Sequence, residues 1–154
     1  MPDSRLAKSP AAVALAPAMI RCPSVPPAEA GVLEVLDQAL RQAGFATRRL
    51  DFAEPGTPDI ANLYASIGSG SPHFCFAGHV DVVPVGDLRA WTVDPFAADI
   101  IDGTLYGRGA ADMKAAIAAF VAATAQYRAQ HEGRGTISLL ITGAAEGTAV
   151  NATK

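Results

Sequence analysis

The chain has little of several features that would assign it to a special class of protein. Its 154 residues contain two cysteines, Cys22 and Cys75, which form no Cys-x-x-Cys pair and exclude a zinc-ribbon or thioredoxin-type motif. Lys and Arg number 12 against 15 Asp and Glu, and a net charge of −3 excludes a strongly basic nucleic-acid-binding protein. The 14 glycines and 11 prolines are close to average usage, which excludes collagen-like and low-complexity chains.

Long apolar runs are also missing. The longest, residues 11–20, is interrupted by Pro17 and is shorter than the roughly 20 residues that span a bilayer. The charged N-terminus lacks the apolar segment of a signal peptide. We therefore expect a soluble cytoplasmic protein that binds neither a membrane nor nucleic acid. The apolar sequence around Cys22 and Cys75 predicts that both thiols are reduced and buried.

What the chain does contain is enough apolar sequence, 50% of its residues, for one domain with a buried core. Strand-like runs alternate with helical patterns, which favours a mixed α/β sheet flanked by helices. The run at 74–77 is apolar without alternation, which predicts a strand covered on both faces. The expected elements are a helix that begins at Ser9-Pro10 and is kinked or shortened by Pro17, a helix over 32–43 capped by Gly44, strands over 45–52, 60–67, 74–77 and 136–142, a hairpin around Asp102-Gly103, and a helix over 111–131.

His79 and Asp81 directly follow the predicted strand at 74–77. Residues i and i+2 of an extended chain point to the same side, so this imidazole and this carboxylate can converge. Such a pair suits a metal-binding histidine whose orientation an acidic neighbour controls. The alternative is a hydrogen-bonded histidine at a strand end beside a surface aspartate.

Two further acidic residues follow predicted elements. Asp112 begins the predicted helix at 111–131, where a carboxylate could simply complement the helix dipole, and Glu146 follows the strand at 136–142, where it could be only solvated. Together with His79 they supply the imidazole and carboxylates that zinc or cobalt accepts. His73 is predicted to begin a strand and His131 to interact with a helix C-terminus.

The wording of the longer motifs is more specific than these single residues. Residues 76–87 (FAGHVDVVPVGD), 102–114 (DGTLYGRGAADMK) and 141–147 (ITGAAEG) resemble the M20 family of zinc amidohydrolases. The resemblance implies the N-terminal part of a zinc-peptidase-like catalytic domain over residues 1–154. It further implies that the rest of that domain, and a separate domain that forms a homodimer, lie outside this sequence.

The resemblance also implies roles for single residues. His79 would bind one zinc ion, Asp112 would bridge two, and Glu146 would bind the other, with cobalt able to replace zinc. Asp81 would support the metal-bound histidine as part of the catalytic group, and the peptide between Asp112 and Met113 would be cis. The implied reaction is hydrolysis of an amide bond in a small-molecule substrate.

One motif departs from the family pattern. Ala144 and Ala145 stand where the family motif Gly-Asp-Glu-Glu-Gly has an aspartate and the glutamate that acts as general base. A methyl group cannot accept a proton, and general-base assistance contributes roughly 10²–10⁴-fold. Two hypotheses follow: a metal-dependent amide hydrolase by descent, and a non-catalytic partial domain that is inactive by itself.

Overall fold

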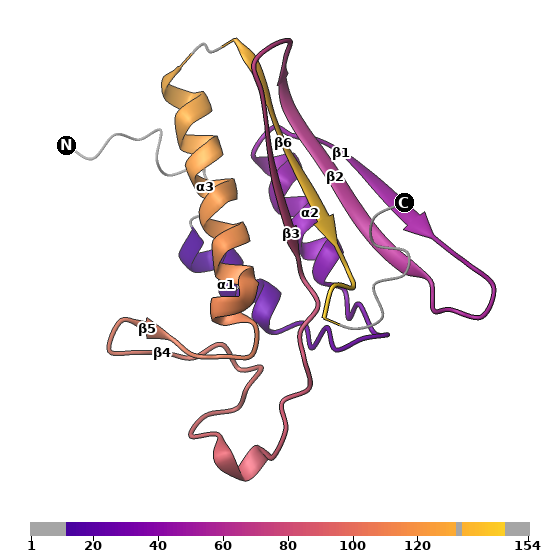
Figure 1. Ribbon diagram of the computed structural model, residues 1–154. Helices are drawn as coiled ribbons and strands as arrows, with labels where there is room; N and C mark the ends of the chain where they lie inside the picture. The colour runs from indigo at the N-terminus through magenta and orange to yellow at the C-terminus, as the bar shows by residue number, and fades with distance from the viewer. Residues whose placement is uncertain (1–11, 132–133, 147–154) are drawn as a thin grey trace.

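The computed structural model describes residues 12–131 and 134–146, and Figure 1 shows helices packed beside a twisted sheet. In chain order the elements are α1 (Ala12–Ile20), α2 (Val32–Gln42), β1 (Ala46–Phe52), β2 (Ile60–Ser69), β3 (His73–His79), a short 3₁₀ turn (Leu88–Ala90), β4 (Ile100–Ile101), β5 (Thr104–Leu105), an irregular turn (Ala110–Lys114), α3 (Ala115–Gln130) and β6 (Gly135–Thr142). No helix of this described part is long and apolar enough to cross a membrane.

The main sheet has the strand order β1-β2-β6-β3. β2 is antiparallel to both β1 and β6, whereas β3 is parallel to β6, so the predicted mixed α/β sheet is confirmed. The register pairs His79 with Thr142. The carboxyl ends of β3 and β6 therefore lie at the same end of the sheet, which is where α/β proteins place ligands.

The core lies between the helices and one face of the sheet. The apolar core residues alternate with other residues on both strands, Leu63 and Ala65 on β2 and Leu139 and Ile141 on β6, as side chains of one sheet face do. The polar neighbours Asn62 and Ser138 are buried as well. Figure 1 shows α3 running alongside β3, and the Phe76 ring of β3 stacks on Phe120 of α3 with ring centroids 4.5 Å apart. The buried cluster contains Leu15, Ala16 and Met19 of α1, Leu33, Leu36 and Leu40 of α2, Ile117, Ala118 and Val121 of α3, Leu63 and Ala65 of β2, and Leu139 and Ile141 of β6.

Local sequence signals place several element ends correctly. Gly44 adopts φ 90° after α2, and the Phe45 N–H donates to the Leu40 carbonyl, which closes the helix in the way its glycine predicts. Asp102 and Gly103 have φ values of 50° and 78°, the positive values of a two-residue hairpin turn between β4 and β5. α1 includes Pro17 and ends at Ile20, whereas the predicted start at Ser9-Pro10 lies outside the described residues.

The prediction that residues 74–77 form a strand covered on both faces is wrong. In the described part of the chain β3 pairs only with β6 and lies at the sheet edge, where Phe74 is 60% exposed. Cys75 is exposed rather than buried, although it is a free thiol as predicted, and Cys22 is half-buried. Residues 74–77 are apolar and do form part of a strand, but their exposure depends on the position of that strand in the sheet. That position is set by pairing with distant residues.

The helix predicted over 111–131 begins later, at Ala115. Asp112 has φ −130° and ψ 97°, and the peptide between Asp112 and Met113 is cis, as the resemblance implied. Asp112 therefore precedes α3 and does not form its first turn. Its backbone is extended and turns the carboxylate toward the end of β3.

Candidate metal centre

Three predicted ligands come together beyond the ends of β3 and β6. One ligand atom from each of His79, Asp112 and Glu146 can be chosen so that all lie within 4.8 Å of one another. His79 Nε2 is 3.2 Å from Asp112 Oδ1 and 3.7 Å from Glu146 Oε1. Because β3 and β6 are parallel and His79 pairs with Thr142, both strands end at the same place. His79 therefore lies near the loop after β6 that carries Glu146.

Asp81 contacts both His79 and the backbone of the loop that carries Glu146. Its side chain is fully buried, and its Oδ2 accepts hydrogen bonds from the backbone N–H groups of Ala145 and Glu146 at 2.8 and 2.7 Å. Its Oδ1 lies 3.2 Å from His79 Nδ1 but forms no hydrogen bond. The hydrogen-bond partner of His79 Nδ1 is the Asp81 backbone carbonyl, also at 3.2 Å. Asp81 thus fixes the loop after β6 and faces the imidazole nitrogen that points away from Asp112 and Glu146.

Ser24 fixes the segment that connects His79 to Asp81. Its buried hydroxyl donates to the Val80 carbonyl at 2.7 Å, and the Val82 N–H donates to the Ser24 carbonyl at 2.9 Å. These bonds hold the chain extended after β3, which keeps residues i and i+2 on one side. Sequence reasoning missed Ser24, because it comes from a turn more than fifty residues earlier and carries no motif of its own.

Lys114 is the other residue that sequence reasoning missed. Its side chain is fully buried, and Nζ donates to the carbonyls of Met19 and Cys22 at 3.0 and 2.9 Å, so it joins the end of α1 to the start of α3. Burial lowers the pKa of Lys114 to about 8, against a smaller opposing effect of the Cys22 thiol and the Asp81 carboxylate. The sequence alone favours solvent exposure for a lysine next to an alanine-rich helix. Its burial follows from the packing of α1 against α3.

The remaining histidines lie outside the cluster. His73 begins β3, as predicted, and its Nε2 is 2.8 Å from Ser138 Oγ. His131 ends α3, where its Nδ1 is 3.0 Å from the Tyr127 carbonyl, consistent with the predicted role at a helix C-terminus. These contacts account for both rings without a metal ion.

The residues of the cluster fit a divalent metal ion. One neutral imidazole nitrogen and two carboxylate oxygens are the donors that zinc and similar ions take, and three protein ligands leave positions open for water or substrate. The Asp81 backbone carbonyl lies 3.2 Å from His79 Nδ1, within hydrogen-bonding distance, and a backbone carbonyl is a partner that a metal-binding histidine usually has. With Nδ1 facing Asp81, the other imidazole nitrogen, His79 Nε2, lies near the carboxylates of Asp112 and Glu146.

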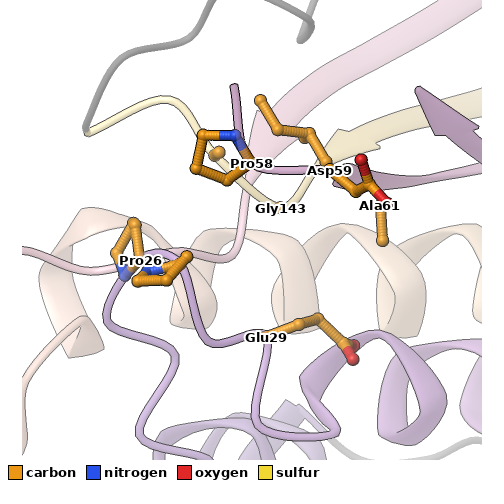
Figure 2. Close-up of a pocket in the computed structure, with 9 residues that line it drawn as sticks. Pro26, Glu29, Pro58, Asp59, Ala61 and Gly143 are labelled. Carbon is orange, nitrogen blue, oxygen red and sulfur yellow. The ribbon is translucent and has the colours of Figure 1, made fainter. Parts of the chain in front are cut away.

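A separate pocket lies next to this centre. It has a volume of about 350 Å³, and Figure 2 shows Pro26, Pro58 and Glu29 around it. Gly143 and Ala144, which precede Glu146 in the loop after β6, form part of its wall. Three segments that are distant in sequence build the pocket, so no local pattern could have predicted it.

Comparison with known proteins identifies the class to which this fold and centre belong, that of α/β metallohydrolases. The chain belongs to the peptidase family M20/M25/M40, whose sequence model matches residues 75–154, just over half of the chain. Membership of this metallopeptidase family implies a divalent metal ion.

Individual relatives agree with this assignment. A succinyl-diaminopimelate desuccinylase of Parvibaculum lavamentivorans is 62% identical over 88% of this chain, and one of Rhodopseudomonas palustris is 57% identical over 96%. This chain spans 34% and 39% of the lengths of these two relatives. Among solved structures, the dipeptidase Dug1p of Saccharomyces cerevisiae has a TM-score of 0.80 at 19% identity, over 95% of this chain and 34% of its own. Human carnosine dipeptidase 1 has a TM-score of 0.73 at 27% identity, over 90% and 33%.

Proposed function

We propose that the chain is part of a metal-dependent amide hydrolase that removes the succinyl group from N-succinyl-LL-2,6-diaminopimelate. The products are succinate and LL-2,6-diaminopimelate, and the proposal includes a role in lysine biosynthesis in the cytoplasm. The observation that carries it is the convergence of His79, Asp112 and Glu146 at the common end of β3 and β6. The identity to proteins named succinyl-diaminopimelate desuccinylase supports the choice of acyl group.

The residues of the centre have separate roles in this proposal. His79 Nε2 and the carboxylates of Asp112 and Glu146 would hold zinc, and cobalt is the expected substitute. The Asp112 side chain is 73% exposed, which leaves its second oxygen accessible to the second ion that the family resemblance implies. A bound divalent ion supplies Lewis acidity toward an amide carbonyl and a water molecule. Asp81 keeps the imidazole and the loop after β6 in place.

Hydrolysis requires that the water oxygen join the acyl carbon, that the C–N bond break and that a proton reach the leaving amine. The family resemblance implies a glutamate as proton carrier at the position of Ala145. The Ala145 backbone N–H donates to Asp81, but its methyl group cannot carry a proton. We therefore propose that this chain by itself holds metal and has little or no turnover, a non-catalytic function that the Ala145 side chain specifically favours. Homodimer formation, through residues outside this sequence, belongs to the same proposal.

The experiment measures cobalt binding and succinate release in parallel. The chain is titrated with Co²⁺ by calorimetry and visible absorption, and then supplied with N-succinyl-LL-2,6-diaminopimelate. His79→Ala is expected to abolish binding, whereas His131→Ala, a histidine outside the cluster, is the matched control and should bind as the unchanged chain does. Equal cobalt affinity in all three proteins would refute the metal centre.

The assay of succinate release separates the two parts of the proposal. We expect little or no release by the unchanged chain. In the full-length context that its relatives possess, Ala145→Glu is expected to raise the rate by about 10²–10⁴-fold, the usual contribution of a general base. Rapid turnover by the unchanged chain would show that Ala145 does not prevent catalysis and would contradict the non-catalytic part.

A further inference from the structure

Gly78 and Met113 fit together beside the candidate metal centre. A Cβ atom added at Gly78 would lie 2.9 Å from Met113 Cε and 3.2 Å from Met113 Sδ. Gly78 is not among the glycines with positive φ, so its backbone conformation is open to other residues. An added methyl group would therefore meet the end of the Met113 side chain, with Phe76 Cε1 also close, at 3.3 Å.

The methionine sulfur also contacts the backbone of the neighbouring ligand. The His79 N–H donates to Met113 Sδ at 3.5 Å. The Val80 N–H donates to the Thr142 carbonyl of β6, and because successive N–H groups of a strand alternate in direction, the His79 N–H points toward the open edge of β3. Met113 covers this edge at the residue that supplies the imidazole.

The Asp112 side chain makes few contacts. Its side chain is 73% exposed, and the hydrogen bond described for its carboxylate is the one to His79 Nε2. The two residues that follow it are anchored instead: Met113 on β3, and Lys114 on the end of α1. The position of the Asp112 carboxylate relative to the imidazole is thus set through its neighbours.

We propose that Met113 is a positioning residue for the metal centre, and that its side chain, seated against Gly78, sets the separation of Asp112 from His79. This inference rests on the proposed metal-binding function. Filling the space at Gly78 should push Met113, and Asp112 with it, away from the imidazole. Shortening Met113 should remove most of this effect, because the added methyl group then meets only Phe76 Cε1, at 3.3 Å.

The test is a double-mutant cycle read by Co²⁺ affinity and by the visible spectrum of the bound ion. Gly78→Ala is expected to weaken binding by about 10–100-fold, as changes behind metal ligands commonly do, and to alter the cobalt absorption bands. The double variant Gly78→Ala/Met113→Ala should bind within about threefold of Met113→Ala alone, since the two sites act through one contact. Ala77→Val, on the exposed side of the same strand, is the matched control and should bind normally.

Conservative replacement separates positioning from loss of the fold. Met113→Leu keeps most of the packing against Gly78 and should bind nearly as the unchanged chain does, whereas Met113→Ala should bind more weakly, with circular dichroism unchanged in both. If Gly78→Ala does not fold, this pair decides: equal affinities of Met113→Ala and the unchanged chain overturn the inference.

Independent effects of Gly78→Ala and Met113→Ala, whose fold-changes multiply in the double variant, would also overturn the inference while leaving the metal centre intact. Failure of the unchanged chain to bind cobalt would overturn both this inference and the proposed function. The two failures are therefore distinguishable.

Discussion

Replacing Lys114 by methionine tests whether an ammonium group is buried next to the metal centre. The pKa of Lys114 is lowered from 10.5 to about 8 by burial. Between these two values the unfolded chain holds a proton that the folded chain has lost, so stability rises with pH in this window. At about 1.36 kcal/mol per pH unit, the free energy of unfolding should rise by at most about 3 kcal/mol between neutral pH and pH 10.5.

Urea denaturation at a series of pH values measures this rise. Methionine does not titrate, so the Lys114→Met variant should lack the increase. Burial raises the pKa of Cys22, which acts in the opposite direction in both proteins, and the charge of Lys114 reduces that rise in the unchanged chain. The lost hydrogen bonds to Met19 and Cys22 lower stability at every pH and do not change the slope. The same slope in both proteins would refute the burial of the charge.

Three further predictions concern the centre and its scaffold. Asp81→Asn keeps an oxygen for two backbone N–H groups but replaces the negative charge beside the imidazole with an NH₂ group. Co²⁺ affinity measured by calorimetry should therefore fall by about 10–100-fold with the fold intact. Unchanged affinity would contradict a role for the Asp81 carboxylate. Gly44→Ala puts a side chain at φ 90° and should cost about 1–2 kcal/mol in urea denaturation, and no loss would exclude strain at this cap. Burial raises the pKa of Asp37, but the Thr47 hydroxyl and Arg41 outweigh it and lower the pKa below 3.8. The stability that Asp37 contributes is thus lost as pH falls through its folded-state pKa, and Asp37→Asn should reduce the acid sensitivity of the melting temperature.

The local structure of the chain could be predicted closely from sequence. The hairpin at Asp102-Gly103 and the end of α2 at Gly44 follow from backbone conformations that neighbouring residues favour. The spans of β1, β2 and β6 differ from their predictions by one or two residues, because glycine or proline lies at or near their ends in the sequence. The family was identified from motifs of seven to thirteen residues, and the sequence comparison shows that identification to be correct.

For the candidate centre, the sequence predicted which residues take part but not how they come together. The sequence named His79, Asp112 and Glu146, but the shared strand end that brings His79 near Glu146 depends on the parallel pairing of β3 with β6. The partners that hold the centre were not predicted, because Ser24 and Lys114 act across long sequence separations.

By itself, then, the sequence determined the helices, the turns, the strand segments and the set of chemical groups, since these depend on residues a few positions apart. The tertiary structure alone decided that β3 exposes Phe74, that Lys114 is buried and that Asp112 leaves the helical conformation. Those outcomes depend on which distant segments pack together, and a side chain's burial or a backbone's distortion is set by that packing and not by its neighbours along the chain.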